Sequence, residues 1–317
     1  MGDALLKMRG AIAAVSRRLP AFRGLGRGWR LVNRWFLKLG AAPVVDARMR
    51  DGTLLRVDLR TRTESGAYYR GEYEDPLIQT VQDLYDCDTD FLDIGANIGF
   101  YSVAMAACIK RQNGAGRIWS FEPFAGNCAR LRENLALNDL TELCRVFEFG
   151  LSNRDRDETL TLREDFELGA GTGNASLAIN VQFDRGFTTA RVPLRTLDSV
   201  ITEITGTGPT IGFVKMDIEG HEDRCLEGAV DTLSAHRPII LMEVNKPYYQ
   251  ARGVDPDTQI LRFIPPEYMI FRYRGSGWGR IRSLRACTSI DNIFLVPAAC
   301  LHLDRFREIF GTSGGGR

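Results

Sequence analysis

Strand-like and helix-like segments alternate along most of this chain, and their order constrains the fold more than any other feature. Strand-like runs cover residues 116–123, 144–152, 211–220 and 237–245, and another opens the stretch 91–102. Segments with helical spacing of apolar residues are 75–86, 98–111, 124–138 and 221–236. Because strands alternate with helices of this length, the pattern predicts a doubly wound α/β fold, a parallel sheet with helices on both faces.

Three segments interrupt this alternation. Residues 44–59 carry an Asp51-Gly52 turn between alternating stretches, which predicts a β-hairpin before the main sheet. Residues 153–195 contain short strand-like stretches around the Gly/Asn-rich segment 168–177, and we expect an insertion or loop lying over a site. Near the end, 267–274 and 290–297 are expected to form a terminal hairpin.

The numbers and spacing of cysteine and histidine limit which metal sites and disulfides the chain can form. The chain of 317 residues has seven cysteines without a CxxC pair, and only three histidines. This spacing argues against a zinc site or a disulfide framework and indicates free thiols in a reducing compartment. We therefore expect a cytoplasmic protein, with a location peripheral to the inner membrane as the alternative.

The first 45 residues carry nine Lys/Arg against Asp3 alone, a local charge of 9 − 1 = +8, although the whole chain is only +1. Apolar residues interleave with these charges, so residues 1–42 are expected to form a basic amphipathic helix or pair of helices, broken near Pro20 and Gly24 to Gly28. Either the segment docks on the domain as a solvated helical extension, or it attaches to an anionic membrane surface or acidic partner. No apolar run is long enough for a membrane span.

A glycine-rich turn follows the first strand of the predicted sheet. Its motif is D-x-G-x-N-x-G, formed by Asp93, Gly95, Asn97 and Gly99, and Glu122 ends the next strand. In an open parallel sheet, ligands bind beyond the carboxyl ends of the strands, and an acidic residue at the second strand accepts hydrogen bonds from a ribose. These positions predict a cofactor that contains adenosine.

Asn97 decides between two such cofactors. A dinucleotide fingerprint, GxGxxG, has glycine where Asn97 stands, so a diphosphate finds no obvious place. S-adenosylmethionine suits the turn better, with Asp93 near its ammonium group and backbone amides near its carboxylate. We predict S-adenosylmethionine, and an NAD(P)-dependent oxidoreductase or a non-catalytic binding module of the same fold stay as alternatives.

Several motifs, in order and at similar spacings, carry a family resemblance. They are "FLDIGANIGFYS" (91–102), "SFEP" (120–123), "NLALN" (134–138), "LDSVI" (197–201), "VKMDIEGHE" (214–222), "CLEGA" (225–229) and "RPIILMEV" (237–244). Together they resemble the FkbM family of S-adenosylmethionine-dependent methyltransferases, over roughly residues 70–275. The resemblance implies a Rossmann-like methyltransferase fold, and we expect that domain over 43–310 with its core at 70–275. The glycine-rich residues 311–317 are expected to form a flexible tail. The resemblance also implies O-methylation of a hydroxyl on a sugar, glycan or related natural product, and it adds Glu74 of "GEYEDP" to the cofactor residues.

Candidate catalytic residues follow the fourth and fifth core strands. An alcohol is a poor nucleophile and benefits from a base that takes its proton. Asp217, His221 and Glu243 are the residues we predict for catalysis, with His221 chosen for the pKa of its side chain. Glu222 reads as a surface helix charge. Asp217, Glu219 and Glu243 could together bind magnesium, but carboxylates at strand ends are also common without metal, and we predict no metal.

The basic residues near the C-terminus have two interpretations. Arg272, Arg274, Arg280, Arg282 and Arg285 surround Trp278. They could bind an acidic sugar or phosphate, or they could form an exposed edge. No nucleic-acid motif accompanies them, so the expected partner is a small-molecule or glycan hydroxyl acceptor and not a nucleic acid.

Overall fold

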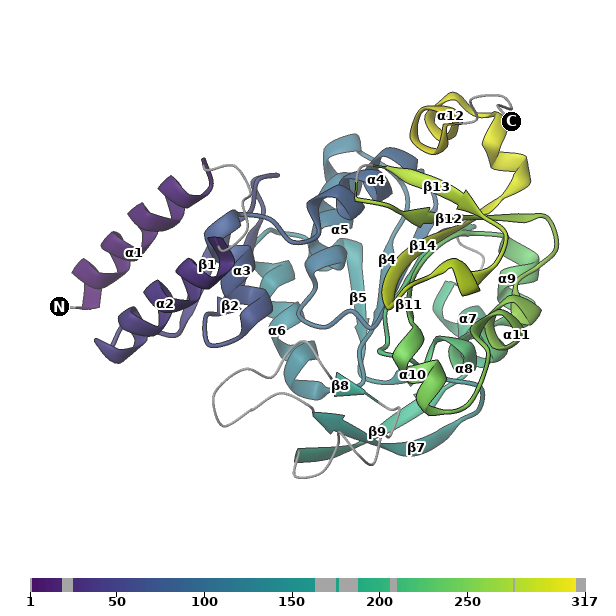
Figure 1. Ribbon diagram of the computed structural model, residues 1–317, viewed down its shortest axis with the longest axis horizontal. Helices are drawn as coiled ribbons and strands as arrows, with labels where there is room; N and C mark the ends of the chain where they lie inside the picture. Colours follow the sequence, from purple (N-terminus) through teal and green to yellow (C-terminus); the bar gives the residue numbers. More distant parts are fainter. Residues whose placement is uncertain are drawn as a thin grey trace.

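The computed structural model describes residues 2–18, 25–162, 175–176, 188–205, 210–275 and 277–311. Its main sheet has eight strands in the order β13-β12-β14-β11-β10-β3-β4-β5 (Figure 1). In that order they are Trp278–Ile281, Tyr268–Tyr273, Ile290–Pro297, Ile239–Asn245, Ile211–Met216, Asp90–Ile94, Ile118–Phe121 and Cys144–Phe147. The strands β11, β10, β3, β4 and β5 pair in parallel, whereas β14, β12 and β13 pair antiparallel with their neighbours. The predicted doubly wound α/β fold is confirmed.

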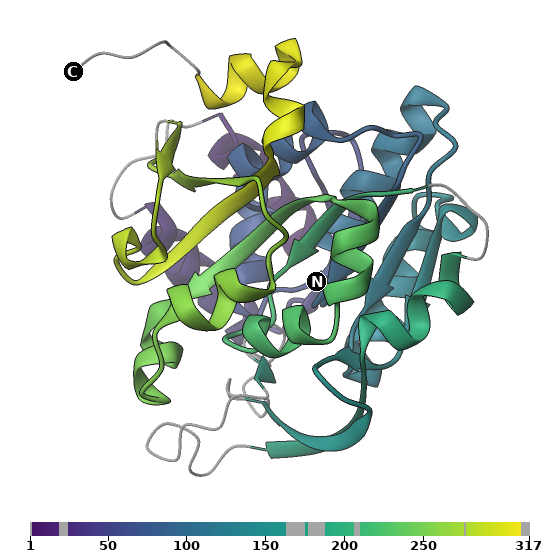
Figure 2. The same cartoon turned by 90° about the vertical axis from the view of Figure 1, so that its right-hand side faces the viewer.

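Helices cover both faces of this sheet (Figure 2). One face carries α4 Asp75–Leu84, α5 Phe100–Gln112, α6 Ala125–Ala136 and α12 Asp304–Phe310. The other carries α7 Leu197–Thr205, α8 Glu222–Glu227, α9 Val230–His236, α10 Lys246–Ala251 and α11 Pro256–Ile260. Short 3-10 turns lie at Thr141–Leu143, Leu261–Phe263, Leu284–Ala286 and Ala298–His302.

Strand side chains alternate between the two helical layers. Phe213 belongs to the core under α4, α5 and α6, whereas its neighbour Val214 belongs to the core under α7 to α11. Phe294 and Leu295 divide in the same way. Successive side chains of a strand point to opposite faces, so a strand covered on both faces is mostly apolar, as β10 and β14 are apart from a few polar residues such as Lys215.

The point where the chain changes direction across the sheet defines the place for a site. From β3 the chain proceeds outward to β4 and β5, and then returns to place β10 on the other side of β3. The carboxyl ends of β3 and β10 therefore lie next to each other, with helices leaving on opposite faces. Ligands of doubly wound folds bind at this position.

A second, smaller sheet corresponds to the predicted insertion. Its order is β6-β9-β7-β8, formed by Gly150–Leu151, Thr188–Arg195, Arg156–Leu162 and Ala175–Ser176. Of the Gly/Asn-rich segment 168–177, only 175–176 lies within the described residues. The first strand of this sheet follows closely on β5, so the sheet begins at the carboxyl edge of the main sheet.

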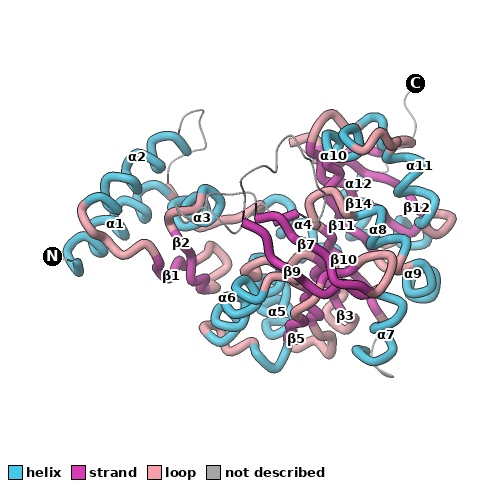
Figure 3. The backbone as a smooth tube through the Cα atoms, turned by 90° about the horizontal axis from the view of Figure 1, so that it is seen from below, coloured by secondary structure: helices cyan, strands magenta, loops and turns pink. Residues whose placement is uncertain are grey.

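The N-terminal part holds two helices, a hairpin and a third helix, side by side at one end of the molecule (Figure 3). They are α1 Gly2–Ser16, α2 Leu25–Lys38, β1 Val44–Arg48, β2 Leu54–Asp58 and α3 Arg62–Arg70. The hairpin prediction is confirmed: β1 and β2 are antiparallel, Gly52 has φ +90°, and Asp51 Oδ1 accepts a hydrogen bond from Thr53 N at 3.0 Å. The expected break at Gly24 to Gly28 is wrong in part, because α2 continues through Gly26 and Gly28.

Two further expectations about elements need correction. The predicted helix 221–236 is two helices, α8 and α9, which meet at Gly228. A Cβ at Gly228 would lie 2.0 Å from the carbonyl oxygen of Ser152, so the chain passes too close there for any side chain. The terminal hairpin partners do pair, as β12 with β14, but β13 from their connection adds an outer strand.

Candidate active site

The turn after β3 brings two loops of the sheet into contact. Gly95 has φ +78°, and a Cβ there would lie 2.0 Å from the carbonyl oxygen of Asp217 at the end of β10. Only glycine allows this backbone conformation at this separation. Asn97 also has positive φ, +52°, a region that asparagine tolerates better than most residues. The turn is therefore shaped so that its backbone borders a cavity.

Glu122 fixes the far side of this turn. Its Oε2 accepts a hydrogen bond from Asn97 N at 2.9 Å, and its Oε1 accepts from Phe124 N at 3.0 Å and Asn127 Nδ2 at 3.3 Å. Burial raises the pKa of the Glu122 carboxyl, and these donors oppose the rise. Each carboxylate oxygen can accept more than one hydrogen bond, so Glu122 has capacity for a ligand as well.

Asp93 and Gly99 belong to the motif, but neither lines the cavity. Asp93 is fully buried, accepts a hydrogen bond from Ser102 Oγ at 2.5 Å, and has Lys215 Nζ at 3.7 Å. Gly99, with φ +94°, would place a Cβ 2.1 Å from Leu131 Cδ1. The two residues support the turn from behind, so the predicted direct contact of each with a cofactor needs correction.

Lys215 is the residue that the sequence reasoning missed. Its Nζ lies 3.7 Å from both Asp93 Oδ1 and Asp217 Oδ2, and it donates a hydrogen bond to Gly95 O at 3.2 Å. Burial lowers the pKa of Lys215, but the charges of Asp217 and Asp93 outweigh burial, so the pKa lies above its usual value. The signal was a single lysine inside the apolar run of β10, where a charge is buried only when it is paired.

Glu74 reaches the cavity from the start of α4. It has φ +45°, a conformation that costs a residue other than glycine about 1–3 kcal/mol. Its Oε2 accepts a hydrogen bond from Tyr101 OH at 2.9 Å. Burial, and after it the charge of Asp217, raises the pKa of Glu74. A strained, buried carboxylate in a cavity indicates a functional position.

Three more carboxylates lie at the ends of β10 and β11. Asp217, Glu219 and Glu243 all line the cavity, and Glu219 has φ +54°. Burial, followed by the negative charges of Asp217 and Glu219, raises the pKa of the Glu243 carboxyl to about 10. Glu243 therefore holds a proton at neutral pH, because burial and the neighbouring carboxylates both disfavour its charged form.

Glu222 holds the loop that carries Asp217 and Glu219. It is fully buried and accepts hydrogen bonds from Ile218 N at 3.2 Å, Gly220 N at 3.1 Å and Tyr249 OH at 3.0 Å. Our interpretation of Glu222 as a surface charge is wrong. The helical period alone predicts that Glu222 points to solvent. The missed signal is the short loop before α8, because its backbone amides need a hydrogen-bond acceptor.

His221 lies outside the cavity. Its Nε2 is 2.9 Å from Ser152 Oγ, and burial lowers its pKa to about 4. The ring is thus neutral at physiological pH and faces the start of the second sheet, not the ends of β10 and β11. His221 is therefore not among the described residues that line the cavity, whereas the predicted Asp217 and Glu243 are.

The C-terminal arginines and Trp278 are not among the described residues that line the cavity. Trp278 packs on Phe294, with ring centroids 4.5 Å apart, and Arg272 Nε pairs with Asp291 Oδ1 at 2.8 Å. These contacts are structural, so this group does not contribute to the cavity.

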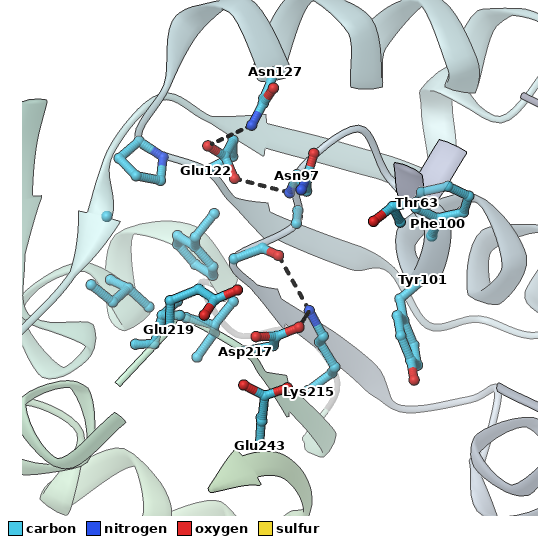
Figure 4. Close-up of a pocket in the computed structure, with 18 of the residues that line it drawn as sticks. Thr63, Asn97, Phe100, Tyr101, Glu122, Asn127, Lys215, Asp217, Glu219 and Glu243 are labelled. Carbon is cyan, nitrogen blue, oxygen red and sulfur yellow. Dashed lines mark hydrogen bonds and ion pairs between the residues drawn. The ribbon is translucent and has the colours of Figure 1, made fainter. Parts of the chain in front are cut away.

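Figure 4 shows the assembled cavity, with Glu122 and Asn97 at one end and Lys215, Asp217 and Glu243 at the other. Five carboxylates are among its described lining residues: Glu74, Glu122, Asp217, Glu219 and Glu243. Lys215 is the one basic side chain in that same set. Within the described part of the chain, no group of three or more His, Cys, Asp or Glu side chains has an arrangement suited to a metal ion.

The charges of the side chains that line the cavity indicate which adenosine-containing cofactor it can hold. A diphosphate would bring negative charge to a cavity whose described carboxylates already outnumber its one lysine. A sulfonium and an ammonium would bring positive charge and would offset it. The donor and acceptor set therefore fits S-adenosylmethionine and opposes a dinucleotide.

Comparison with known proteins identifies the family. The sequence model of the methyltransferase FkbM domain matches residues 93–284. The chain therefore belongs to the FkbM methyltransferase family, and its fold is the Rossmann-like methyltransferase fold.

The individual proteins and solved structures that resemble this chain have low sequence identity to it. The AMB antimetabolite synthetase AmbE of Pseudomonas aeruginosa is 30% identical over 186 residues, which are 50% of this chain and 8% of that protein. The FkbM methyltransferase from Methylobacillus flagellatus KT is 19% identical with a TM-score of 0.41, over 76% of this chain and 56% of that one. The O-methyltransferase TomG from Streptomyces achromogenes is 12% identical with a TM-score of 0.39, over 70% of this chain and 78% of that one. The chain thus spans a small part of the first and about half of the second.

Proposed function

We propose that this protein is an S-adenosylmethionine-dependent O-methyltransferase whose acceptor is a hydroxyl of a sugar, glycan or related natural product. The observation that carries the proposal is the cavity at the ends of β3 and β10, where a glycine turn meets an excess of carboxylates. Membership of the FkbM methyltransferase family supports the proposal that the transferred group is a methyl group.

The cavity residues that would bind the cofactor form two sets, one for its ribose and one for its amino-acid part. Glu122 would accept hydrogen bonds from the ribose hydroxyls, since it stands at the end of β4 and its carboxylate has acceptor capacity to spare. The backbone of Gly95 to Asn97 would lie along the amino-acid part. Glu74 would hold the ammonium group, the role first predicted for Asp93, because Glu74 lines the cavity and Asp93 does not.

Proton removal falls to the carboxylates at the other end. S-adenosylmethionine, when bound, supplies a methyl group on a positively charged sulfur. Asp217 would accept the proton of the acceptor hydroxyl as its oxygen attacks, and the ion pair with Lys215 at 3.7 Å holds the carboxylate in place. Glu243 also lines the cavity at this end and would help to orient the same hydroxyl. The surplus of negative charge favours a neutral acceptor group over a phosphate at this position.

Binding of S-adenosylhomocysteine to Glu122 variants tests the cofactor site. Glu122→Ala should weaken binding by roughly 10- to 100-fold, because a hydrogen bond to a charged group contributes about 1.5–3 kcal/mol. Glu122→Gln keeps one acceptor oxygen and should lose less. Calorimetry measures both, with Glu148→Ala, a half-exposed carboxylate paired with Arg132, as the control. Unchanged affinity in Glu122→Ala would remove the proposed ribose contact.

Cofactor affinity should also depend on pH through Glu243. The protonated carboxyl is neutral, so a cationic ligand favours its ionised form, and binding should release a proton. Because burial and the neighbouring carboxylates raise the pKa of Glu243 to about 10, the affinity for S-adenosylmethionine should rise as the pH increases from 7 towards 9.

S-adenosylhomocysteine lacks the sulfonium charge and should show a smaller rise over the same range. Glu243→Gln cannot ionise and should flatten the difference between the two ligands. Titrations in buffers of different ionisation enthalpy would count the released proton. Equal pH dependence of both ligands, or none, would contradict the assigned charge of Glu243.

A further inference from the structure

The helices α1 and α2 dock on α3 through one face each. Ser16 Oγ donates a hydrogen bond to Tyr69 O at 2.6 Å, Arg17 Nη2 donates to Tyr68 O at 2.7 Å, and Trp29 stacks on Tyr69 with centroids 6.1 Å apart. Phe36 of α2 is fully buried. Of the two interpretations of residues 1–42, docking on the rest of the protein therefore accounts for the inner faces of the helices. It does not account for their outer faces.

Both helices also carry exposed apolar side chains at several positions. These side chains are Leu6, Met8 and Val15 on α1 and Leu31 and Trp35 on α2, followed by Leu39. Leu31 is 65% exposed and Trp35 is 51% exposed. They account for six of the ten large apolar side chains exposed among the described residues, so the apolar exposure is concentrated here.

The charges among these side chains have one sign. The exposed basic residues of the two helices are Lys7, Arg18, Arg27, Arg30, Arg34 and Lys38. No acidic residue occurs in 4–18 or 25–40. On α2, the helical period places Arg27, Arg34 and Lys38 on the same side as Leu31 and Trp35, opposite the buried Phe36. Basic residues flanking exposed Leu and Trp are typical of a helix that lies in a membrane interface.

We propose that the outer faces of α1 and α2 form a docking surface for an anionic membrane. The apolar side chains would enter the boundary between headgroups and acyl chains, and the basic side chains would lie against the phosphates. Within the described residues, no helix has the length and apolar character needed to cross a membrane, so the proposal concerns surface attachment. It does not depend on the proposed reaction.

The position of this surface relates it to the cavity. Both helices contact α3, and Thr63 in the first turn of α3 lines the cavity. In Figures 1 and 3 the two helices form one end of the molecule, beside α3 and the hairpin. Attachment there would hold the cavity close to the lipid surface, which suits an acceptor presented at a membrane.

Co-sedimentation of the full chain with vesicles tests the proposal. The protein should bind vesicles of phosphatidylcholine that contain phosphatidylglycerol, and should bind pure phosphatidylcholine much more weakly. The triple variant Arg27→Glu, Arg34→Glu, Lys38→Glu should reduce the partition coefficient by at least about 100-fold, because each basic residue near an anionic surface contributes about 1 kcal/mol. Added salt should weaken binding of the unmodified chain.

Two further variants separate the membrane from other acidic partners. Leu31→Ser with Trp35→Ser keeps every charge and should reduce binding about 10-fold or more, since it removes the apolar insertion. Three exposed arginines elsewhere, Arg262, Arg274 and Arg282, changed to Glu provide the matched control and should leave binding unchanged. Circular dichroism and melting temperature establish that each variant is folded.

Failure to bind anionic vesicles would overturn the proposal, as would equal binding to both vesicle types. If the charge reversals abolish binding but the serine variant retains it, and heparin competes fully, the surface recognises acidic macromolecules by charge alone and the proposal is wrong. Vesicle binding does not measure methyl transfer. A failure of the proposed function would therefore be distinguishable from a failure of the proposed membrane attachment.

Discussion

Asp217→Asn is expected to slow methyl transfer by roughly 10²- to 10⁴-fold, the range that a positioned base contributes. Asparagine occupies the same space and still accepts hydrogen bonds, but it cannot take a proton at neutral pH. The affinity for S-adenosylhomocysteine should change by only a few fold, because the contacts proposed for the ribose lie at the other end of the cavity (Figure 4). Transfer of labelled methyl groups into fractionated glycans and metabolites measures the rate.

Asp231→Asn is the matched control, an exposed aspartate on α9 whose loss should not affect the rate. Retention of full activity by Asp217→Asn would show that the proton leaves by another route. Glu243→Gln should then be the slow variant instead, which would exchange the two assigned roles. If neither substitution affects transfer, the carboxylates at β10 and β11 are not the base.

Gly95→Ala is expected to abolish detectable cofactor binding. The added Cβ would meet the carbonyl oxygen of Asp217 at 2.0 Å, and alanine is strained at φ +78°. The turn and the end of β10 must separate, which displaces both the proposed binding backbone and Asp217. We expect a loss of affinity of more than about 100-fold, together with destabilisation of about 2–6 kcal/mol, the range for strain and overpacking combined.

Gly26→Ala makes the same chemical change where nothing lies within 4 Å of the new Cβ, inside α2. This control should keep its affinity and should gain up to about 1 kcal/mol of stability from helix propensity. Calorimetry and thermal melts of the two variants give the comparison. Normal binding by Gly95→Ala would mean that the turn does not border the ligand.

The fold was predictable because apolar periodicity and glycine placement report on it directly. Strands buried on both faces read as continuous apolar runs, and Gly95 with Asn97 marks the turn at the change of direction. The boundary inside 221–236 was not predictable, since Gly228 is required by the approach of Ser152, which is distant in the sequence.

The candidate site was only partly predictable for a related reason. Sequence position placed Asp93 at the strand end, but its side chain is buried against Ser102 and Lys215, and Lys215 comes from β10, which is distant in the sequence. The choice of His221 used the ordinary pKa of histidine, and burial against Ser152 changes that value. Glu243 was identified by position, but its raised pKa comes from burial first and then from the carboxylates of Asp217 and Glu219 after β10, which only the fold brings close.

The central claim is that this cavity accepts a cationic adenosyl ligand and excludes a nucleotide diphosphate. Calorimetric titration of the full chain with S-adenosylmethionine, S-adenosylhomocysteine, NADH and NADPH tests it most directly. The account predicts saturable binding of the first two, with S-adenosylmethionine the tighter at alkaline pH, and no binding of either nicotinamide cofactor. Saturable NADH or NADPH binding, with none for the two adenosyl ligands, would contradict it.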